Sequence, residues 1–432
     1  MTKQAIGKYR WTICTLIFFA TTINYLDRQV ISLVKINLDE EFGWSKNDYA
    51  NITIAFQLAY AIGMLGVGRL IDRLGSKIGY ALSLFLWSLA AIGHALVRST
   101  TGFMVARGFL GITEAGNFPA AIRTVAEWFP KKERALATGI FNSGTNVGAI
   151  IAPLTVPFIA AEWGWRWAFI ITGLIGLIWL IFWFILYEIP KKHKKLSKEE
   201  FEYIHSDLDE KKDEEAVGEK VSWWTLLGFK QTWAFAWGKF MTDGVWWFYL
   251  FWLPDFLNEQ YHLSATQIAI PIAAVYMIST IGSIYGGWLP MNYIKKGWPV
   301  FKARKTSMLI YALCALPVLA AQLLGGYSMW FAVLIIGFAA AAHQAWSANI
   351  FTTVSDMFPK KTIGSIIGIG GMAGGIGGMI ISKAAGLLFD YYKGLGHIET
   401  GYLIMFIFCG LAYLIGWLIM HMLVPTMKRV VV

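Results

Sequence analysis

The chain consists of long apolar runs separated by short polar stretches, and this alternation restricts its fold more than any other feature. Of its 432 residues, 56% are hydrophobic and 15% are charged, which is too apolar for an ordinary soluble domain. A bilayer core about 30 Å thick needs roughly 20 apolar residues for each helical span. The sequence therefore predicts an all-α membrane protein with twelve transmembrane helices.

The apolar runs fall into two groups of six. We expect helices at residues 11–34, 47–71, 78–97, 101–124, 135–160 and 165–187, and then at 231–257, 266–290, 303–324, 328–352, 363–390 and 399–423. Basic residues such as Arg73, Lys77, Lys132 and Lys361 gather in alternate loops, and such loops face the cytoplasm. This pattern places both termini in the cytoplasm.

A six-residue motif occurs once in each group. Residues 127–132 read Glu-Trp-Phe-Pro-Lys-Lys and residues 356–361 read Asp-Met-Phe-Pro-Lys-Lys, and each copy precedes a glycine-rich helix. We therefore expect an N-terminal six-helix bundle at 1–187, a cytoplasmic linker at 188–230 and a C-terminal six-helix bundle at 231–432. Parallel repeats of this kind are one way to build a transporter with a central site.

The linker carries mixed charges instead of an apolar run. Ser197 is followed three residues later by Glu200, a spacing typical of a capping box at a helix N-terminus. We expect a short surface helix near residues 197–208 and assign the linker no binding role.

The composition also excludes several classes of function. Cys14, Cys314 and Cys409 lie in apolar runs outside any CxxC motif or Cys/His cluster, so neither a disulfide nor a metal site is indicated. We find no nucleophile or cofactor motif and expect no enzyme and no cofactor. The net charge of +10 comes from basic residues in short loops, which favours anionic lipid headgroups over nucleic acid as neighbours.

Residues 68–77 read Gly-Arg-Leu-Ile-Asp-Arg-Leu-Gly-Ser-Lys, which resembles the signature loop between helices 2 and 3 of the major facilitator superfamily. The resemblance implies the fold of two six-helix bundles and a gating role for Gly68, Asp72, Arg73 and Gly75. Physically, the glycines let helices approach closely. Asp72 would pair with basic groups or a helix N-terminus on the cytoplasmic side and so favour the closed state.

Two further segments, residues 24–28 and 107–119, resemble the anion:cation symporter group of that superfamily. Within the group, residues 343–349 look most like hexuronate transporters. The resemblance implies a monomer in the bacterial inner membrane that imports sugar acids such as glucuronate or galacturonate with protons. One departure is the glycine run at 374–378, where some sugar-acid members have an amide.

Arg28 lies in the middle of the first expected span, where a bare cation costs about 2.5 to 3.5 kcal/mol even on a lenient insertion scale. It should therefore face a watery cavity and an anionic partner. That partner is either the substrate carboxylate or a carboxylate of the bundle in a permanent ion pair. The adjacent Asp27 points about 100° away around the helix and need not neutralise Arg28.

Arg107 and Glu114 are seven residues apart and lie on nearly one face of a helix. Burial raises the pKa of a carboxyl group and a nearby arginine lowers it, so a conformational change can load and release a proton. We interpret Asp27, Arg107 and Glu114 as the proton-coupling group. The alternative is that Arg107 and Asp27 form a fixed brace.

Residues of other expected helices complete the candidate binding site. The resemblance implies that Tyr60 and Asn142 face the cavity. Trp246 and Tyr249 offer aromatic faces that suit the C–H side of a sugar, although such residues also serve as packing.

His343, Gln344 and Asn349 place polar groups where lipid offers no partner, so they either bind substrate hydroxyls or cross-link helices. Lys239 and Asp243 are four residues apart and should pair with each other. For that pair a structural bridge is favoured over transport chemistry.

These features predict proton-coupled uptake of a hexuronate or related organic anion by alternating access. A facilitator or exchanger for another organic anion or a phosphate ester is the alternative, because a cationic pocket binds such anions equally well. A non-transporting nutrient sensor is a third possibility, although such sensors usually carry a signalling domain.

Overall fold

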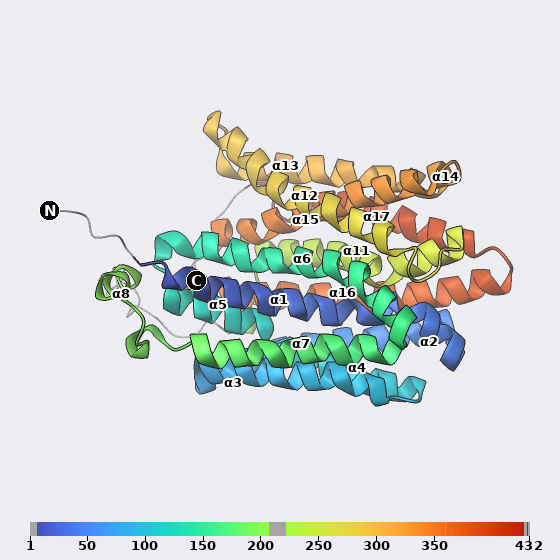
Figure 1. The fold of residues 1–432 in the computed structure, drawn as a ribbon. Helices are drawn as coiled ribbons and strands as arrows, with labels where there is room; N and C mark the ends of the chain where they lie inside the picture. Colours follow the sequence, from blue (N-terminus) through green and yellow to red (C-terminus); the bar gives the residue numbers. More distant parts are fainter. Residues whose placement is uncertain (1–6, 207–221, 359, 427–429, 431–432) are drawn as a thin grey trace. The chain divides into compact units, whose positions relative to one another are not determined.

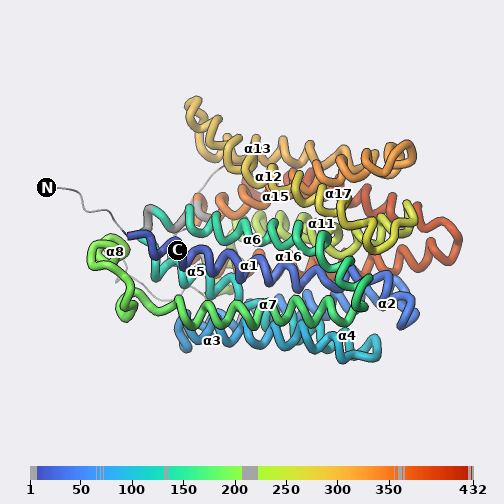
Figure 2. The backbone as a smooth tube through the Cα atoms, viewed as in Figure 1, coloured from blue at the N-terminus to red at the C-terminus, as the bar shows by residue number. Residues whose placement is uncertain are grey.

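The computed structural model describes residues 7–206, 222–358, 360–426 and 430, and within these ranges it contains helices and loops but no strand (Figures 1 and 2). This confirms the all-α fold class. The chain divides into two compact units. The first unit contains Met1–Val30 and Ala59–Glu219, and the second contains Ile31–Leu58 and Lys220–Val432.

All six spans expected in the first half of the chain are helical. The helices are α1 (Tyr9–Leu33), α2 (Lys35–Phe42), α3 (Lys46–Gly93), the 3-10 helix η1 (His94–Leu96), α4 (Thr100–Glu114), α5 (Asn117–Trp128), α6 (Lys131–Trp163) and α7 (Trp165–Leu186). Helix α3 contains two expected spans, and Gly75 between them has a φ of 80° and a ψ of 163°, outside the helical range. Glycine adopts this conformation without the steric penalty of a Cβ atom.

The linker begins with the 3-10 helix η2 (Pro190–Lys192) and α8 (Lys198–Ile204). The Ser197 hydroxyl accepts a hydrogen bond from the Glu200 N–H at 3.2 Å, which confirms the predicted helix start. The Glu200 carboxylate accepts hydrogen bonds from the N–H groups of Tyr9 and Arg10, both at 3.0 Å. It therefore caps α1 and ties this part of the linker to the first unit.

The six spans expected in the second half are helical as well. They are covered by α11 (Lys230–Tyr261), α12 (Ala269–Lys295), α13 (Val300–Ala315) with η4 (Leu316–Ala320) and α14 (Ala321–Gly325), α15 (Met329–Met357), α16 (Lys360–Gly394) and α17 (Ile398–Leu423), and the short α10 (Trp223–Leu227) precedes them.

In the described part of the chain, eight helices are long and apolar enough to cross a membrane on length and composition alone. The four expected spans in α1, in the first part of α3 (residues 47–71), in α4 with α5 and in α11 are not among them. Three of these four carry charged residues of the candidate site or of its neighbourhood, namely Arg28 in α1, Glu114 in α4 and Lys239 in α11.

Close packing in the second unit depends on glycines. A Cβ atom at Gly282 would lie 2.0 Å from the carbonyl oxygen of Ala341, and one at Gly286 would lie 2.5 Å from the Cα atom of Ala345. Helices α12 and α15 thus meet backbone to backbone, as small residues allow in membranes.

We expect Gly286→Ala to lower the melting temperature of the purified protein, because its Cβ would overlap the Ala345 backbone. Overpacking of this kind costs about 1–3 kcal/mol. Gly287→Ala is the matched control, since a Cβ there meets nothing within 4 Å. Thermal unfolding in detergent measures the difference, and equal melting temperatures would contradict the backbone contact.

Candidate functional site

The centre of the first unit holds a buried ion pair between α1 and α4. Arg28 donates from both Nε and Nη2 to Glu114 Oε2, each at 3.0 Å, and Nη2 also donates to Asn24 Oδ1 at 3.3 Å. The two charged side chains are 3% and 0% exposed. The other carboxylate oxygen, Glu114 Oε1, is buried and accepts no hydrogen bond within the described residues.

The other two residues of the proposed proton-coupling group lie beside this pair. Arg107 is fully buried and donates from both terminal nitrogens to the main-chain carbonyl of Arg28 at 3.4 Å. Asp27 is buried near the Thr172 hydroxyl and the Trp87 indole. Neither the Thr172 hydroxyl nor the Trp87 indole is placed to donate a hydrogen bond to Asp27. Within the described residues, neither Asp27 oxygen accepts a hydrogen bond.

Aromatic rings cover the Arg28 guanidinium. Its Cζ atom lies 4.6 Å from the ring centre of Tyr25 and 4.9 Å from that of the half-buried Tyr60, so both contribute cation–π attraction. Tyr60 therefore joins the Arg28 cluster. Asn142 is exposed on α6, and its backbone carbonyl accepts a bond from Thr145.

The gating segment predicted around Gly75 is anchored to the end of α5. Tyr187 donates to Ser76 Oγ at 2.6 Å and to Glu127 Oε2 at 2.9 Å. Arg123 donates to Glu127 Oε1 at 3.0 Å. This places the acidic residue of the first repeated motif at the signature loop.

Of the other gating residues, Arg73 is exposed and Gly68 has open space where a Cβ would point. The side chain of Asp72 lies outside the described residues. Lys77 pairs with Glu188 at 2.8 Å, and this hydrogen bond holds the pKa of Glu188 below its usual range although partial burial opposes the shift.

In the second unit, Trp246 of α11 is stacked on His343 of α15, with ring centres 4.9 Å apart and an angle of 10°. His343 Nδ1 is hydrogen-bonded to the Tyr413 hydroxyl at 2.7 Å. The structure therefore brings these two predicted site residues together and fixes both by a contact with α17.

The remaining predicted residues of this unit differ in their surroundings. Asn349 donates to the carbonyls of Gly286 at 2.6 Å and Ala345 at 2.9 Å, so it cross-links α12 and α15. Tyr249 is buried with its hydroxyl unbonded within the described residues, and Gln344 is half-buried.

Lys239 and Asp243 form the predicted pair on α11, with Lys239 Nζ 2.8 Å from Asp243 Oδ2. The ammonium group also lies 4.5 Å from the ring centre of Phe351.

A second charged cluster was not predicted. Lys46 Nζ lies 2.6 Å from both Asp255 and Glu259, and Lys35 lies 2.9 Å from Asp255. Tyr402 also donates to Asp255. The only sequence signal was a pair of carboxylates four residues apart near the end of α11. Their partners Lys35 and Lys46 are more than 200 residues away in sequence.

Asp39, in the short helix α2, belongs to this cluster through Lys35. Burial raises the pKa of Asp39, although the Lys35 ammonium opposes the shift. The cluster attaches residues 31–58, which contain the end of α1, α2 and the start of α3, to α11 inside the second unit.

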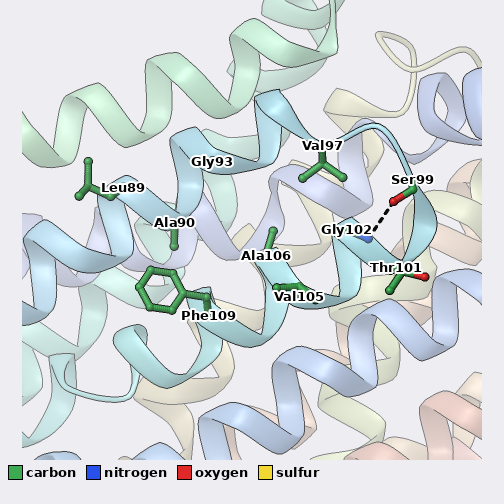
Figure 3. A pocket seen from close by; sticks show the side chains of 10 residues that line it. All are labelled: Leu89, Ala90, Gly93, Val97, Ser99, Thr101, Gly102, Val105, Ala106 and Phe109. Atoms are coloured by element: carbon green, nitrogen blue, oxygen red, sulfur yellow. Dashed lines mark hydrogen bonds between the residues drawn. The ribbon is translucent and has the colours of Figure 1, made fainter.

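The described residues include no group of three or more His, Cys, Asp or Glu side chains placed to hold a metal ion. Figure 3 shows an open groove of about 510 Å³ between the end of α3 and α4. Its lining is mainly apolar, including Leu89, Val105 and Phe109, and it contains no charged side chain. It therefore has none of the chemistry expected of an anion site.

Comparison with known sequences adds three similarities. The sequence profile of the Major Facilitator Superfamily matches residues 17–382. The Hexuronate transporter of Escherichia coli (strain K12) is 30% identical over 388 residues, covering 90% of this chain and 89% of that protein. The Galacturonate transporter of Dickeya chrysanthemi is 35% identical over 286 residues, covering 66% of this chain and 83% of that protein.

Among solved structures, the D-xylose-proton symporter superposes with a TM-score of 0.76 at 17% identity, covering 98% of this chain and all of that one. At this identity the likeness concerns the fold, which is the predicted twelve-helix fold of two six-helix bundles.

We expect Lys46→Met to lower the melting temperature far more than Lys393→Met. Both ammonium groups contact Glu259 Oε1, but the Lys46 side chain is 4% exposed and that of Lys393 is 55% exposed. Removing one partner of a buried ion pair costs about 3–5 kcal/mol, whereas an exposed pair contributes about 0–1 kcal/mol. Thermal unfolding in detergent compares the two, and similar losses would show that the cluster is not buried as described.

Proposed function

Because the chain belongs to the Major Facilitator Superfamily, a family of transporters and not of enzymes, we propose that it imports a sugar acid such as a hexuronate together with protons. The related sugar-acid transporters support the substrate class. The observation that carries the proposal is the buried pair of Arg28 and Glu114, because it provides both an anion-binding cation and a titratable carboxylate.

The mechanism begins with an exchange of carboxylates at Arg28. Both bonds from Arg28 end on the single oxygen Glu114 Oε2. A substrate carboxylate could instead accept two parallel bonds from the planar guanidinium. When the substrate takes this place, Glu114 loses its neutralising cation, and a buried carboxylate without a partner is costly.

Protonation of Glu114 would remove the cost of leaving its carboxylate buried without a cation. Glu114 Oε1 has no hydrogen-bond partner within the described residues, so it is a place where a proton can bind. Protonated Glu114 and substrate-bound Arg28 then leave the cluster with the same net charge as the empty pair. Substrate and proton are therefore coupled by charge balance.

Asp27 is the candidate for a second proton. Its two oxygens are buried without hydrogen-bond donors from the described chain, a situation that favours a neutral carboxyl group. Arg107 would position Asp27 and Arg28 by donating hydrogen bonds to the main-chain carbonyl of Arg28.

The rest of the binding site would come from Tyr60 beside Arg28 and from Trp246, His343 and Gln344 in the second unit. Trp246 offers an aromatic face to the C–H side of a sugar. For Asn349 we favour helix cross-linking over substrate binding, since its amide already donates to the carbonyls of Gly286 in α12 and Ala345 in α15.

We further propose that the protein acts as a monomer in a bacterial inner membrane with both termini in the cytoplasm. The bundles at 1–187 and 231–432, joined by the linker at 188–230, would alternate access to the site. Gly68, Asp72, Arg73 and Gly75 would gate one side, since the Gly75 turn is tied to α5 through Glu127.

The substrate proposal is tested by thermal shift with D-glucuronate, D-galacturonate and D-glucose on purified protein. We expect both sugar acids, and not glucose, to stabilise the protein, by about 2.7 kcal/mol at 100 times the Kd. Arg28→Lys should lose most of this shift, because an ammonium group cannot make the parallel bonds of a guanidinium.

The exposed Arg98 gives the control variant Arg98→Lys, which should respond as the wild type does. Equal stabilisation by glucose would overturn the carboxylate-centred site. A normal shift in folded Arg28→Lys would make that arginine purely structural.

Proton coupling is tested with Glu114→Gln in proteoliposomes. The amide keeps the shape of the side chain but cannot titrate, so we expect substrate exchange to persist while accumulation driven by a pH gradient falls to background. An inside-negative potential should speed wild-type uptake if two protons accompany a monoanion and leave it unchanged if one does. Undiminished accumulation by the variant would remove Glu114 from coupling and favour the facilitator or exchanger.

A further inference from the structure

The linker begins with a dense run of basic residues. Residues 191–195 read Lys-Lys-His-Lys-Lys, and the side chains of all four lysines are exposed. The run follows closely after Leu186, where α7 ends, and leads to α8 (Figure 1). From its sequence we assigned the linker no binding role, but the surroundings of these lysines indicate one.

The carboxylates near this basic run are mostly paired with other cations. Three salt bridges occupy them, namely Glu188 with Lys77, Glu200 with Arg10 and Glu202 with Lys198. Glu199 is exposed and forms no salt bridge with a described residue. None of the four lysines of the run forms a salt bridge with a described residue either. Their positive charge is therefore available to an external anion.

Packing holds the run in place. The ring centre of His193, in its middle, lies 4.3 Å from that of Tyr9 in α1 and 5.4 Å from that of Trp128 in α5. His193 Nε2 is hydrogen-bonded to the Leu186 carbonyl at 3.2 Å, and Pro190 is buried. The backbone between the lysines is thus already ordered, so binding a partner costs less conformational entropy than it would for a flexible tail.

The end of α7 shows where lipid lies relative to the run. Helix α7 is long and apolar enough to cross a membrane. Its last two turns expose large apolar side chains by 50% to 68%, namely those of Ile181, Phe182, Phe184 and Ile185. In a membrane protein such a surface contacts lipid tails, and the headgroup layer begins where the hydrocarbon core ends. The lysines just beyond this surface therefore lie at the level of the lipid phosphates.

We propose that residues 191–195 bind the phosphate of an anionic phospholipid headgroup. Each lysine ammonium offers three hydrogen-bond donors, and the attraction of several lysines to an anionic membrane surface adds up. Glu200 ties the following helix α8 to the start of α1 through the N–H groups of Tyr9 and Arg10. A lipid that holds the run therefore also stabilises the attachment of the linker to α1, which raises the melting temperature.

The test titrates the purified full chain, in an uncharged detergent, with three probes and follows its melting temperature. The probes are dioctanoyl phosphatidylglycerol, dioctanoyl phosphatidylcholine and inorganic phosphate. We expect the anionic lipid to act at a concentration at least about tenfold lower than the zwitterionic lipid, and phosphate to have no effect. Salt at 1 M should weaken the effect of the anionic lipid, because the Debye length falls to about 3 Å.

Equal action of the two lipids would show that their tails alone stabilise the protein, which would overturn the proposal. A shift with inorganic phosphate as large as that with the anionic lipid would also overturn it, since the partner would then be a soluble anion.

Two variants that each lose four lysines locate the effect. The test variant changes Lys191, Lys192, Lys194 and Lys195 to Gln, and the control changes the exposed Lys230, Lys295, Lys296 and Lys302 of the second unit to Gln. We expect the test variant to need at least about tenfold more anionic lipid for the same shift, and the control less than about threefold more. Changing the four lysines of the run to Arg should preserve binding, because the charge is kept.

Equal losses in the two Gln variants would mean that only net charge matters, and unchanged binding by the test variant would remove the run from lipid binding. Either result would refute the proposal. The proposed substrate site is tested separately, because neither variant changes a residue of the Arg28 cluster.

Discussion

The buried pair of Arg28 and Glu114 is the interaction on which the first unit depends. A charge inside the hydrocarbon layer survives only with a partner, and removing one member of such a pair leaves the other uncompensated at a cost of about 3–5 kcal/mol. The neighbouring groups serve this requirement: Asn24 accepts from Arg28, Tyr25 and Tyr60 face its guanidinium, and Arg107 holds its carbonyl. In the mechanism that we propose, a substrate anion would therefore replace Glu114 as the partner of Arg28.

The same requirement accounts for how polar groups inside the spans are paired. Since lipid tails are as apolar as leucine, close glycine contacts hold helices together in the second unit. Between α12 and α15 the Asn349 amide adds a hydrogen bond to the Gly286 carbonyl. Polar groups that remain inside a span must be used by another side chain or by a ligand. Asn349 is used by the α12 backbone and His343 by Tyr413, whereas the Asp243 carboxylate keeps acceptor capacity beyond its bond to Lys239.

The helices could be predicted from sequence because the bilayer sets a minimum length for an apolar span, and the cap at Ser197 because it is a local interaction. That Arg28 needs a carboxylate also followed from physical chemistry. The identity of that partner, Glu114, could not be predicted, because the two residues are 86 positions apart and sequence spacing does not show which helices are in contact. For the same reason the cluster of Lys35, Lys46 and Asp255 was missed.

The cluster of Lys35, Lys46 and Asp255 bears on which contacts between helices can break and form again. Residues 31–58 belong by sequence to the first six helices, yet they group with the second unit, where Lys35 and Lys46 meet Asp255. In the alternating-access cycle that we propose, contacts between the two halves of the sequence would have to break and form again. Ion pairs near a helix end can exchange their partners for water, whereas overlapping glycine backbones lose dispersion contacts that water does not replace. Both kinds of contact join residues 31–58 to the second half of the sequence, because a Cβ atom at Gly386 would lie 2.9 Å from the carbonyl oxygen of the same Lys46 that pairs with Asp255. The exchangeable ion pairs therefore lie beside a close backbone contact.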